Sequence, residues 1–106
     1  MKTAIYKYEV QPGEFSHEIP GLIQLLTVQM QGDIPQFWAV VIPEAEPVTH
    51  KFHAYGTGHD LSDNPGRYIG TFQMDWMVFH LFYEGIAKGK PDIAITKAEL
   101  KDLMGI

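Results

Sequence analysis

The part of this sequence best suited to hold a ligand is the run Tyr55-Gly56-Thr57-Gly58-His59. Gly56 and Gly58 allow positive backbone φ angles around Thr57, so that successive N–H groups can point the same way. The resulting concavity could accept an anion or a carbonyl group, with Tyr55 and His59 at its rim. The alternative interpretation is a tight turn, in which the glycines only satisfy geometry and the Thr57 hydroxyl caps the bend.

A second pairing of glycine with threonine follows at Gly70-Thr71, shortly after Arg67. Within a strand pattern, Gly70 indicates a β-bulge or a close approach of another backbone, and the simpler interpretation is a bend that closes the sheet. The alternative brings Thr71 and Arg67 near the glycine loop, where the Arg67 guanidinium would suit bidentate recognition of an anion. The candidate binding residues are therefore Tyr55, Gly56, Thr57, Gly58, His59, Arg67 and Thr71.

Five histidines raise the question of a metal site. His50 and His53 lie on one predicted strand at a spacing that points them to opposite faces, so they make a poor pair of ligands. The sequence has no HExxH motif and no closely spaced series of aspartates. We therefore expect no bound metal and no cofactor. One combination stays open, a site built from His59, Asp60 and a strand histidine.

Catalytic motifs are absent from the sequence. Neither Ser16 nor Ser62 lies in a GxSxG elbow. The chain has no cysteine, which excludes a thiolate nucleophile, a zinc finger, a disulfide scaffold and a cysteine-held iron–sulfur cluster. We name no catalytic residue and expect a binding protein rather than an enzyme, although His59 or His80 could serve as a general base.

The composition is that of one globular domain. The chain has 106 residues, of which 45% are hydrophobic and 20% charged, an ordinary balance for a single core. Its 13 acidic and 8 basic residues give a net charge of −5, which disfavours binding of nucleic acid through its phosphates. No signal peptide or membrane span is recognisable. We therefore expect a soluble cytoplasmic protein that binds neither nucleic acid nor membranes.

The elements that must position the candidate residues are short strands separated by turn residues. Alternation of apolar and polar residues, and clusters of glycine and proline, predict seven of them. Their ranges are 4–10, 15–19, 22–31, 36–42, 48–55, 67–72 and 75–83. The run 36–42 is almost wholly apolar, which predicts a central strand buried on both faces. The glycine motif begins the eleven-residue loop 56–66, between two strands.

The last predicted strand is apolar on both faces. One face carries Trp76, Val78, His80 and Phe82, and the other carries Met77, Phe79, Leu81 and Tyr83. A chain this small can hardly cover both faces of an edge hairpin from within. The surplus apolar face therefore predicts a homo-oligomer.

The end of the chain changes character. Residues 85–91 read as a linker containing glycine and lysine, and residues 96–104 are predicted to form a helix. Thr96 is a good N-cap, Glu99 completes a capping box, and Gly105 follows the C-terminal end of the helix.

Together these elements predict a mostly β fold, α+β by strict definition. We expect a small antiparallel sheet curled into a barrel or a sandwich, with one short C-terminal helix. Residues 1–84 form the antiparallel β domain. Residues 85–106 form the linker and the helix, which packs on that domain or on a neighbouring subunit because so short a helix is marginal alone.

Five pieces of the sequence resemble a family of small uncharacterised proteins of tailed phages and prophages. They are Tyr6-Lys7-Tyr8, Phe37-Trp38-Ala39-Val40-Val41, Tyr55-Gly56-Thr57-Gly58-His59, Tyr68-Ile69-Gly70-Thr71-Phe72-Gln73 and Phe79-His80-Leu81-Phe82. The likeness spans residues 5–84, and the third and fourth pieces are its most specific part. It implies a phage or prophage origin and a setting in the host cytoplasm, and it brings no activity and no catalytic residue.

The resemblance favours an accessory protein without enzymatic activity, which inhibits a host or anti-phage defence protein by binding to its surface. The acidic charge and the surplus apolar face fit that role. One alternative is a protein that sequesters a small anionic molecule, such as a nucleotide, through the Gly56–His59 loop. Another alternative is a minor structural protein of the virion.

Overall fold

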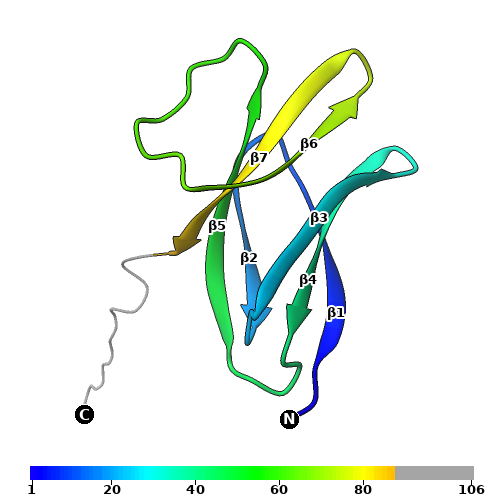
Figure 1. Ribbon diagram of the computed structural model, residues 1–106, viewed down its shortest axis with the longest axis vertical. Helices are drawn as coiled ribbons and strands as arrows, with labels where there is room; N and C mark the ends of the chain where they lie inside the picture. Colours follow the sequence, from blue (N-terminus) through cyan, green and yellow to red (C-terminus); the bar gives the residue numbers. More distant parts are fainter. Residues whose placement is uncertain (88–106) are drawn as a thin grey trace, which may run out of the picture.

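Seven β-strands make up residues 1–87, the part of the chain that the computed structural model describes (Figure 1). They are β1 (Ala4–Glu9), β2 (Gly13–Pro20), β3 (Gln24–Gln31), β4 (Ile34–Val41), β5 (Pro47–Gly56), β6 (Arg67–Met74) and β7 (Met77–Ile86). Every predicted strand is present, with its ends shifted by a few residues. Residues 1–87 contain no helix long and apolar enough to cross a membrane. The helix predicted at 96–104 lies outside the described residues.

The strands form two antiparallel sheets. One sheet has the strand order β1-β4-β3 and the other has the order β2-β5-β7-β6. The prediction of a barrel is therefore wrong, because within residues 1–87 no strand of one sheet pairs with a strand of the other. The connections after β1, β2 and β4 each carry the chain from one sheet to the other.

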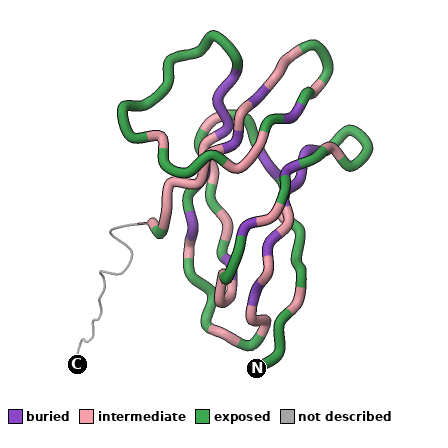
Figure 2. The backbone as a smooth tube through the Cα atoms, viewed as in Figure 1, coloured by how far each residue is buried: buried purple, intermediate pink, exposed green. Residues whose placement is uncertain are grey.

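The core lies between the inner faces of the two sheets. Its largest fully buried side chains are Phe37, Phe52, Ile19, Leu81 and Val41, and Figure 2 shows the buried positions distributed over both sheets. Phe37 of β4 and Phe52 of β5 meet there, with ring centroids 4.7 Å apart. Burial of these large apolar side chains is the main source of stability for a domain of this size.

Strand β4 is central in its sheet, as predicted, but only one of its faces is fully buried. Phe37, Ala39 and Val41 face the core, whereas Trp38 and Val40 on the other face are half-buried. The prediction of burial on both faces is wrong because no third layer within the described residues covers the outer side of this sheet.

The tip of the β6–β7 hairpin also differs from the prediction. Asp75 has a left-handed backbone, with φ at 57°, and the turn leaves Trp76 84% exposed. Trp76 therefore belongs to the turn and not to a strand face. The opposite face of β7 agrees with the prediction, since Phe79 and Leu81 are buried in the core.

Candidate functional site

The glycine loop and the larger sheet enclose a pocket. Residues 57–66 leave the end of β5 and return to β6 beside β7 (Figure 1). The pocket, which we call the loop pocket, has a volume of about 280 Å³. It is lined by Tyr55, Gly56, Thr57, Gly58, His59, Leu61, Tyr68, His80 and Phe82. The whole Tyr55–His59 motif therefore lies in its lining.

Aromatic rings form one wall of the loop pocket. Strand pairing places Tyr68 opposite Phe82 and Tyr55 opposite His80, so these side chains share the outer face of the sheet. The Phe82 ring is T-shaped to both tyrosine rings, with 5.6 Å between the centroids of each pair. A wall of this kind suits a flat ring compound.

A chain of hydrogen bonds holds the imidazole of His80. The Tyr68 hydroxyl lies 2.6 Å from Thr71 Oγ1, which lies 3.0 Å from His80 Nδ1. The other ring nitrogen, Nε2, lies 2.7 Å from Thr57 Oγ1. The Thr57 hydroxyl in turn donates to the carbonyl of Val78 at 3.2 Å. Both nitrogens of the ring are thus engaged, which fixes its orientation in the pocket.

The backbone of the glycine loop is used by the fold itself. The N–H of Thr57 donates to the carbonyl of Val78 at 2.9 Å, and the N–H of His59 donates to the carbonyl of Gly56 at 3.0 Å. Gly58 has a positive φ of 88°, as predicted, whereas Gly56 does not have a positive φ. Two amides expected to hold an anion are therefore already bonded. The geometry agrees with the alternative interpretation, a tight turn capped by the Thr57 hydroxyl.

The ring of His59 packs over the backbone of Gly56. A Cβ atom at Gly56 would lie 2.7 Å from Nδ1 of His59, so only glycine leaves room for the ring in this position. Tyr55, Gly56 and His59 also line a second cavity of about 520 Å³, which reaches Met74 and Met77 of the hairpin. These three residues form a wall between the two cavities.

The remaining predicted residues, Thr71 and Arg67, have different places. Thr71 is joined to the loop pocket by its hydrogen bonds, as described above. Arg67 is exposed and does not line the pocket. It pairs opposite Tyr83, which packs against the core, whereas the next residue, Tyr68, pairs opposite the outward-facing Phe82. Tyr68 therefore takes the position at the pocket that was predicted for Arg67.

Three residues that line the loop pocket are not singled out by the sequence. They are Leu61, Tyr68 and Phe82. His80, named there only as a possible general base, lines the pocket as well. The alternation of β7 does place His80 and Phe82 on one face, as predicted. Which residues of β6 meet that face depends on a register shift between Tyr68 and Gly70. No local sequence pattern predicts where such a shift occurs.

A separate group of possible metal ligands lies on the same sheet. In the described part of the chain, one ligand atom each of Glu14, His53 and Glu84 lies within 4.8 Å of the other two. The sequence does not predict this group, and the combination left open there, His59 with Asp60, does not belong to it.

The family of the chain follows from comparison with known proteins. No curated protein and no solved structure matches the sequence or the fold. A family model described as a domain of unknown function, DUF7352, matches residues 1–90, a range that includes all seven strands. The chain therefore belongs to the DUF7352 family.

Proposed function

We propose that this protein binds a small, flat, uncharged molecule in the loop pocket, with the size and chemistry of a nucleobase or nucleoside. The observation that carries the proposal is the wall formed by Tyr55, Tyr68 and Phe82. Aromatic side chains around a concave site favour planar ligands. The volume of about 280 Å³ is near the lower end of ordinary ligand sites, roughly 300 Å³.

The polar groups around the pocket favour an uncharged ligand over an anion. The N–H groups of Thr57 and His59 donate within the fold, and Arg67 lines no part of the pocket. Tyr68 is 54% exposed, and its hydroxyl oxygen can accept a further hydrogen bond from a ligand. We therefore expect the base of a nucleoside to bind and a phosphate group, where present, to stay in solvent.

Binding without turnover fits the surroundings of His80. Both of its ring nitrogens are engaged by Thr57 and Thr71. A general base needs a nitrogen within hydrogen-bond reach of the substrate. Thr71, whose hydroxyl could be activated by His80, does not line the pocket. We therefore propose that the protein sequesters its ligand.

Ligand-observed NMR with adenosine, guanosine, cytidine and uridine tests this function. Ribose 5-phosphate, which has the charge but no base, is the matched anionic probe. We expect at least one nucleoside to bind and to shift the backbone resonances of residues 55–61, and ribose 5-phosphate to leave them unchanged. Binding of ribose 5-phosphate alone, or of none of the five compounds, would contradict the proposal.

Two tyrosine variants locate the binding site. Tyr68 of β6 and Tyr6 of β1 are 54% and 40% exposed, and both lie on edge strands, so replacing either by alanine costs little stability. Tyr68→Ala should weaken nucleoside binding roughly 5- to 150-fold, because base–aromatic stacking is worth about 1–3 kcal/mol. Tyr6→Ala should leave the affinity unchanged. Equal losses in the two variants would place the ligand elsewhere.

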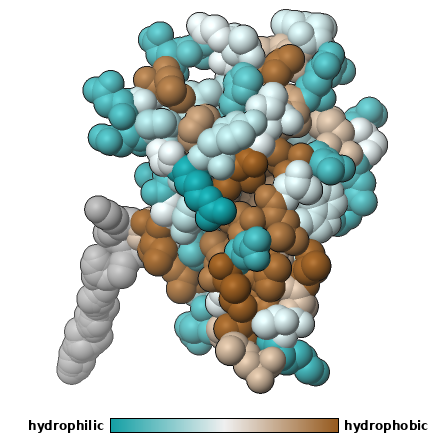
Figure 3. All heavy atoms as spheres, viewed as in Figure 1, coloured by the Kyte–Doolittle hydropathy of each residue, from teal (hydrophilic) through white to brown (hydrophobic). Residues whose placement is uncertain are grey.

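A second candidate function, binding of a partner protein, is supported by exposed apolar surface. Trp76 is 84% exposed at the hairpin tip, and tryptophan is common among the residues that dominate protein interfaces. Figure 3 shows apolar side chains gathered over β2, β3 and β4 on one face of the molecule. With the resemblance to phage proteins, these features support a phage-encoded accessory protein that inhibits a host or defence protein in the host cytoplasm.

Affinity capture from a host lysate tests the second candidate when wild type is compared with matched variants. A partner that depends on the hairpin tip should be retained by wild type and by Tyr6→Ala and lost by Trp76→Ala. A partner retained by all three would contradict a role for Trp76. Finding the chain in purified particles by mass spectrometry would instead support the minor virion protein.

We also propose self-association, although the structure leaves less apolar surface exposed on β7 than the sequence suggests. The outer face of β7, which carries His80 and Phe82, lies against the loop that contributes Leu61 to the same pocket. Light scattering during size exclusion measures the oligomer directly. A mass of one chain at every concentration would contradict the predicted homo-oligomer.

A further inference from the structure

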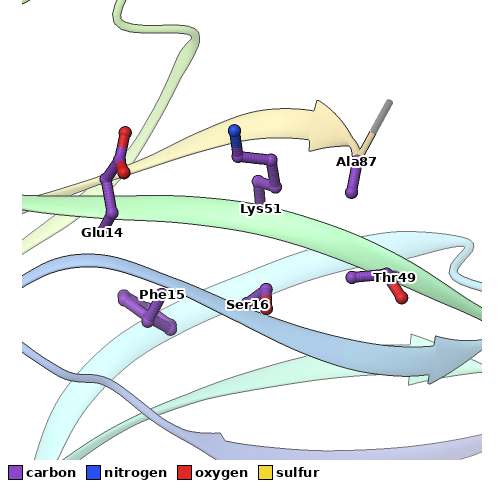
Figure 4. A pocket seen from close by; sticks show the side chains of 6 residues that line it. All are labelled: Glu14, Phe15, Ser16, Thr49, Lys51 and Ala87. Carbon is purple, nitrogen blue, oxygen red and sulfur yellow. The ribbon is translucent and has the colours of Figure 1, made fainter. Parts of the chain in front are cut away.

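Glu14, His53 and Glu84 come from three neighbouring strands of the larger sheet. Glu14 of β2 is the pairing partner of His53 of β5, and β7, which carries Glu84, lies on the other side of β5. Figure 4 shows Glu14 and Lys51 projecting to the same side of the sheet. The topology thus brings two carboxylates and one imidazole together from distant parts of the sequence, with ligand atoms within 4.8 Å of one another.

An irregularity in β7 directs Glu84 toward this group. The register shifts between Tyr83 and Gly85, so Glu84 is an extra residue that has no partner on β5. Such bulges change the direction of a side chain and are common next to functional sites. The carboxylate of Glu84 lies 3.7 Å from Nδ1 of His53.

Tyr55 holds the imidazole of His53 in place. The two rings are parallel, with centroids 3.8 Å apart and an angle of 3° between their planes. Tyr55 itself is only 7% exposed, so it offers a rigid surface to the imidazole. A ligand side chain that is already ordered loses less conformational entropy when it binds an ion.

The hydroxyl of Tyr55 is buried and has no hydrogen-bond partner among the described residues. The hydroxyl belongs to the ring that stacks on the imidazole of His53, so it lies near that side chain. A buried hydroxyl without a partner destabilises the fold, and a bound water or ion is one explanation for such a group. A water molecule held by an ion at His53 would supply the partner.

The group carries more negative charge than its surroundings balance. The contact between His53 and Glu84, which is an ion pair only when the imidazole is protonated, is the only contact of this kind within residues 1–87, and Lys51, although close by, does not pair with either carboxylate. Two carboxylates that converge on one imidazole repel each other. A divalent cation between them would replace that repulsion with attraction.

We propose that Glu14, His53 and Glu84 bind one divalent transition-metal ion, Zn²⁺ or Mn²⁺, with the Tyr55 hydroxyl bonded to a water on the ion. One imidazole nitrogen with two carboxylate oxygens suits these ions, whereas Ca²⁺ and Mg²⁺ prefer oxygen ligands alone. The three ligands do not line the loop pocket. Tyr55 does line it, so the His53 and Glu84 variants are the ones that test the metal site independently of nucleoside binding.

Calorimetric titration of the full chain, without an affinity tag, with ZnCl₂ and with MnCl₂ tests the site, and native mass spectrometry gives the stoichiometry. We expect one ion per chain, removed by EDTA. His53→Ala and Glu84→Gln should each weaken binding at least about 10- to 100-fold, the loss usual for groups that only support a ligand. Glu18→Gln, on β2 with Glu14, is the matched control and should bind as wild type does.

Tyr55→Phe separates the role of the hydroxyl from that of the ring. Metal affinity should fall about tenfold, while the melting temperature without metal should not fall, because the substitution removes a buried group that has no partner. Unchanged metal affinity in Tyr55→Phe would overturn the role of the hydroxyl. The proposed site would be wrong if neither Zn²⁺ nor Mn²⁺ binds, or if Glu18→Gln loses as much affinity as the ligand variants. Full binding by the double variant of His53→Ala and Glu84→Gln would also contradict it.

Discussion

The hydroxyl of Tyr83 on β7 lies 2.7 Å from Nδ1 of His50 on β5. A phenol donates its proton to a neutral imidazole nitrogen, so the neutral form of His50 with its proton on Nε2 fits this contact. His50 is only 6% exposed, and burial lowers the pKa of His50 below its ordinary value of 6.5. Burial also raises the pKa of Tyr83 above 10.0. The folded state therefore favours both groups uncharged.

We expect this pair to make the protein sensitive to acid. The unfolded chain takes up a proton on His50 near pH 6.5, whereas the folded chain, with the lowered pKa, does not. The unfolded state then binds more protons, so the free energy of unfolding falls as the pH drops through about 6.5 toward the folded-state pKa. Urea unfolding between about pH 7.5 and pH 5 measures this fall.

Two histidine variants assign that fall to His50. His50→Gln should reduce the pH dependence, and His59→Gln, at an exposed position, should keep it. If the two variants have the same pH profile as wild type, His50 is not the group responsible.

Gly70 allows the two sheets to approach each other. A Cβ atom there would lie 2.6 Å from Cγ1 of Val28, whose side chain is buried on β3. Gly70→Ala should therefore lower the free energy of unfolding by about 1–3 kcal/mol, the usual cost of overpacking. In a chain that already carries Val28→Ala, the same substitution should cost much less, because the obstructing methyl groups are gone. Denaturant unfolding of the four chains measures the coupling, and additive costs would contradict this close contact.

Gly56 and Gly58 should respond differently to alanine. At Gly56 a Cβ atom would meet the ring of His59, and His59 is exposed, so the ring can move away. Gly56→Ala should then shift the His59 ring resonances with little loss of stability. Gly58 has open space around it but a φ of 88°, so Gly58→Ala should leave His59 in place and cost about 1–2 kcal/mol. NMR and thermal unfolding distinguish the two outcomes. A Gly58→Ala variant that keeps its stability but displaces His59 would contradict the roles given to the two glycines.

The strands could be predicted from sequence because their signals are local. Gly32-Asp33 marks the turn between β3 and β4, and the alternation of Phe79 and Leu81 identifies the buried face of β7. The sequence left a barrel and a sandwich open, since the division into two sheets depends on where three connections lead. The apolar character of Trp76 predicts a strand, but Asp75, with its left-handed backbone, begins a turn at that point.

The candidate sites divide in the same way. The Tyr55–His59 motif is contiguous, so its residues could be recognised together. Tyr68 reaches the loop pocket in place of Arg67 because of the register of β6 on β7, which no spacing in the sequence reveals. The same holds for Glu14, His53 and Glu84, which become neighbours only through the pairing of β2, β5 and β7 and the irregularity at Glu84.

The hydrogen bonds around His80 predict its tautomer. The Thr57 hydroxyl has one proton, which it donates to the carbonyl of Val78, so it must accept from Nε2 of His80 at 2.7 Å. Nδ1 is then unprotonated and accepts from Thr71, which in turn accepts from Tyr68. In the neutral ring, all four hydrogen bonds form together only when His80 carries its proton on Nε2.

Nitrogen-15 NMR of the imidazole rings measures this tautomer directly. The neutral ring of His80 should show a protonated Nε2 and an unprotonated Nδ1. Thr71→Val removes the donor to Nδ1 without changing the shape of the side chain, so it should raise the fraction of His80 rings that carry a proton on Nδ1. The His59 ring, which is outside this chain of hydrogen bonds, should stay unchanged. A wild-type His80 protonated on Nδ1 would show that Thr57 donates to the ring and not to Val78, and the direction of the whole chain of bonds would then be reversed.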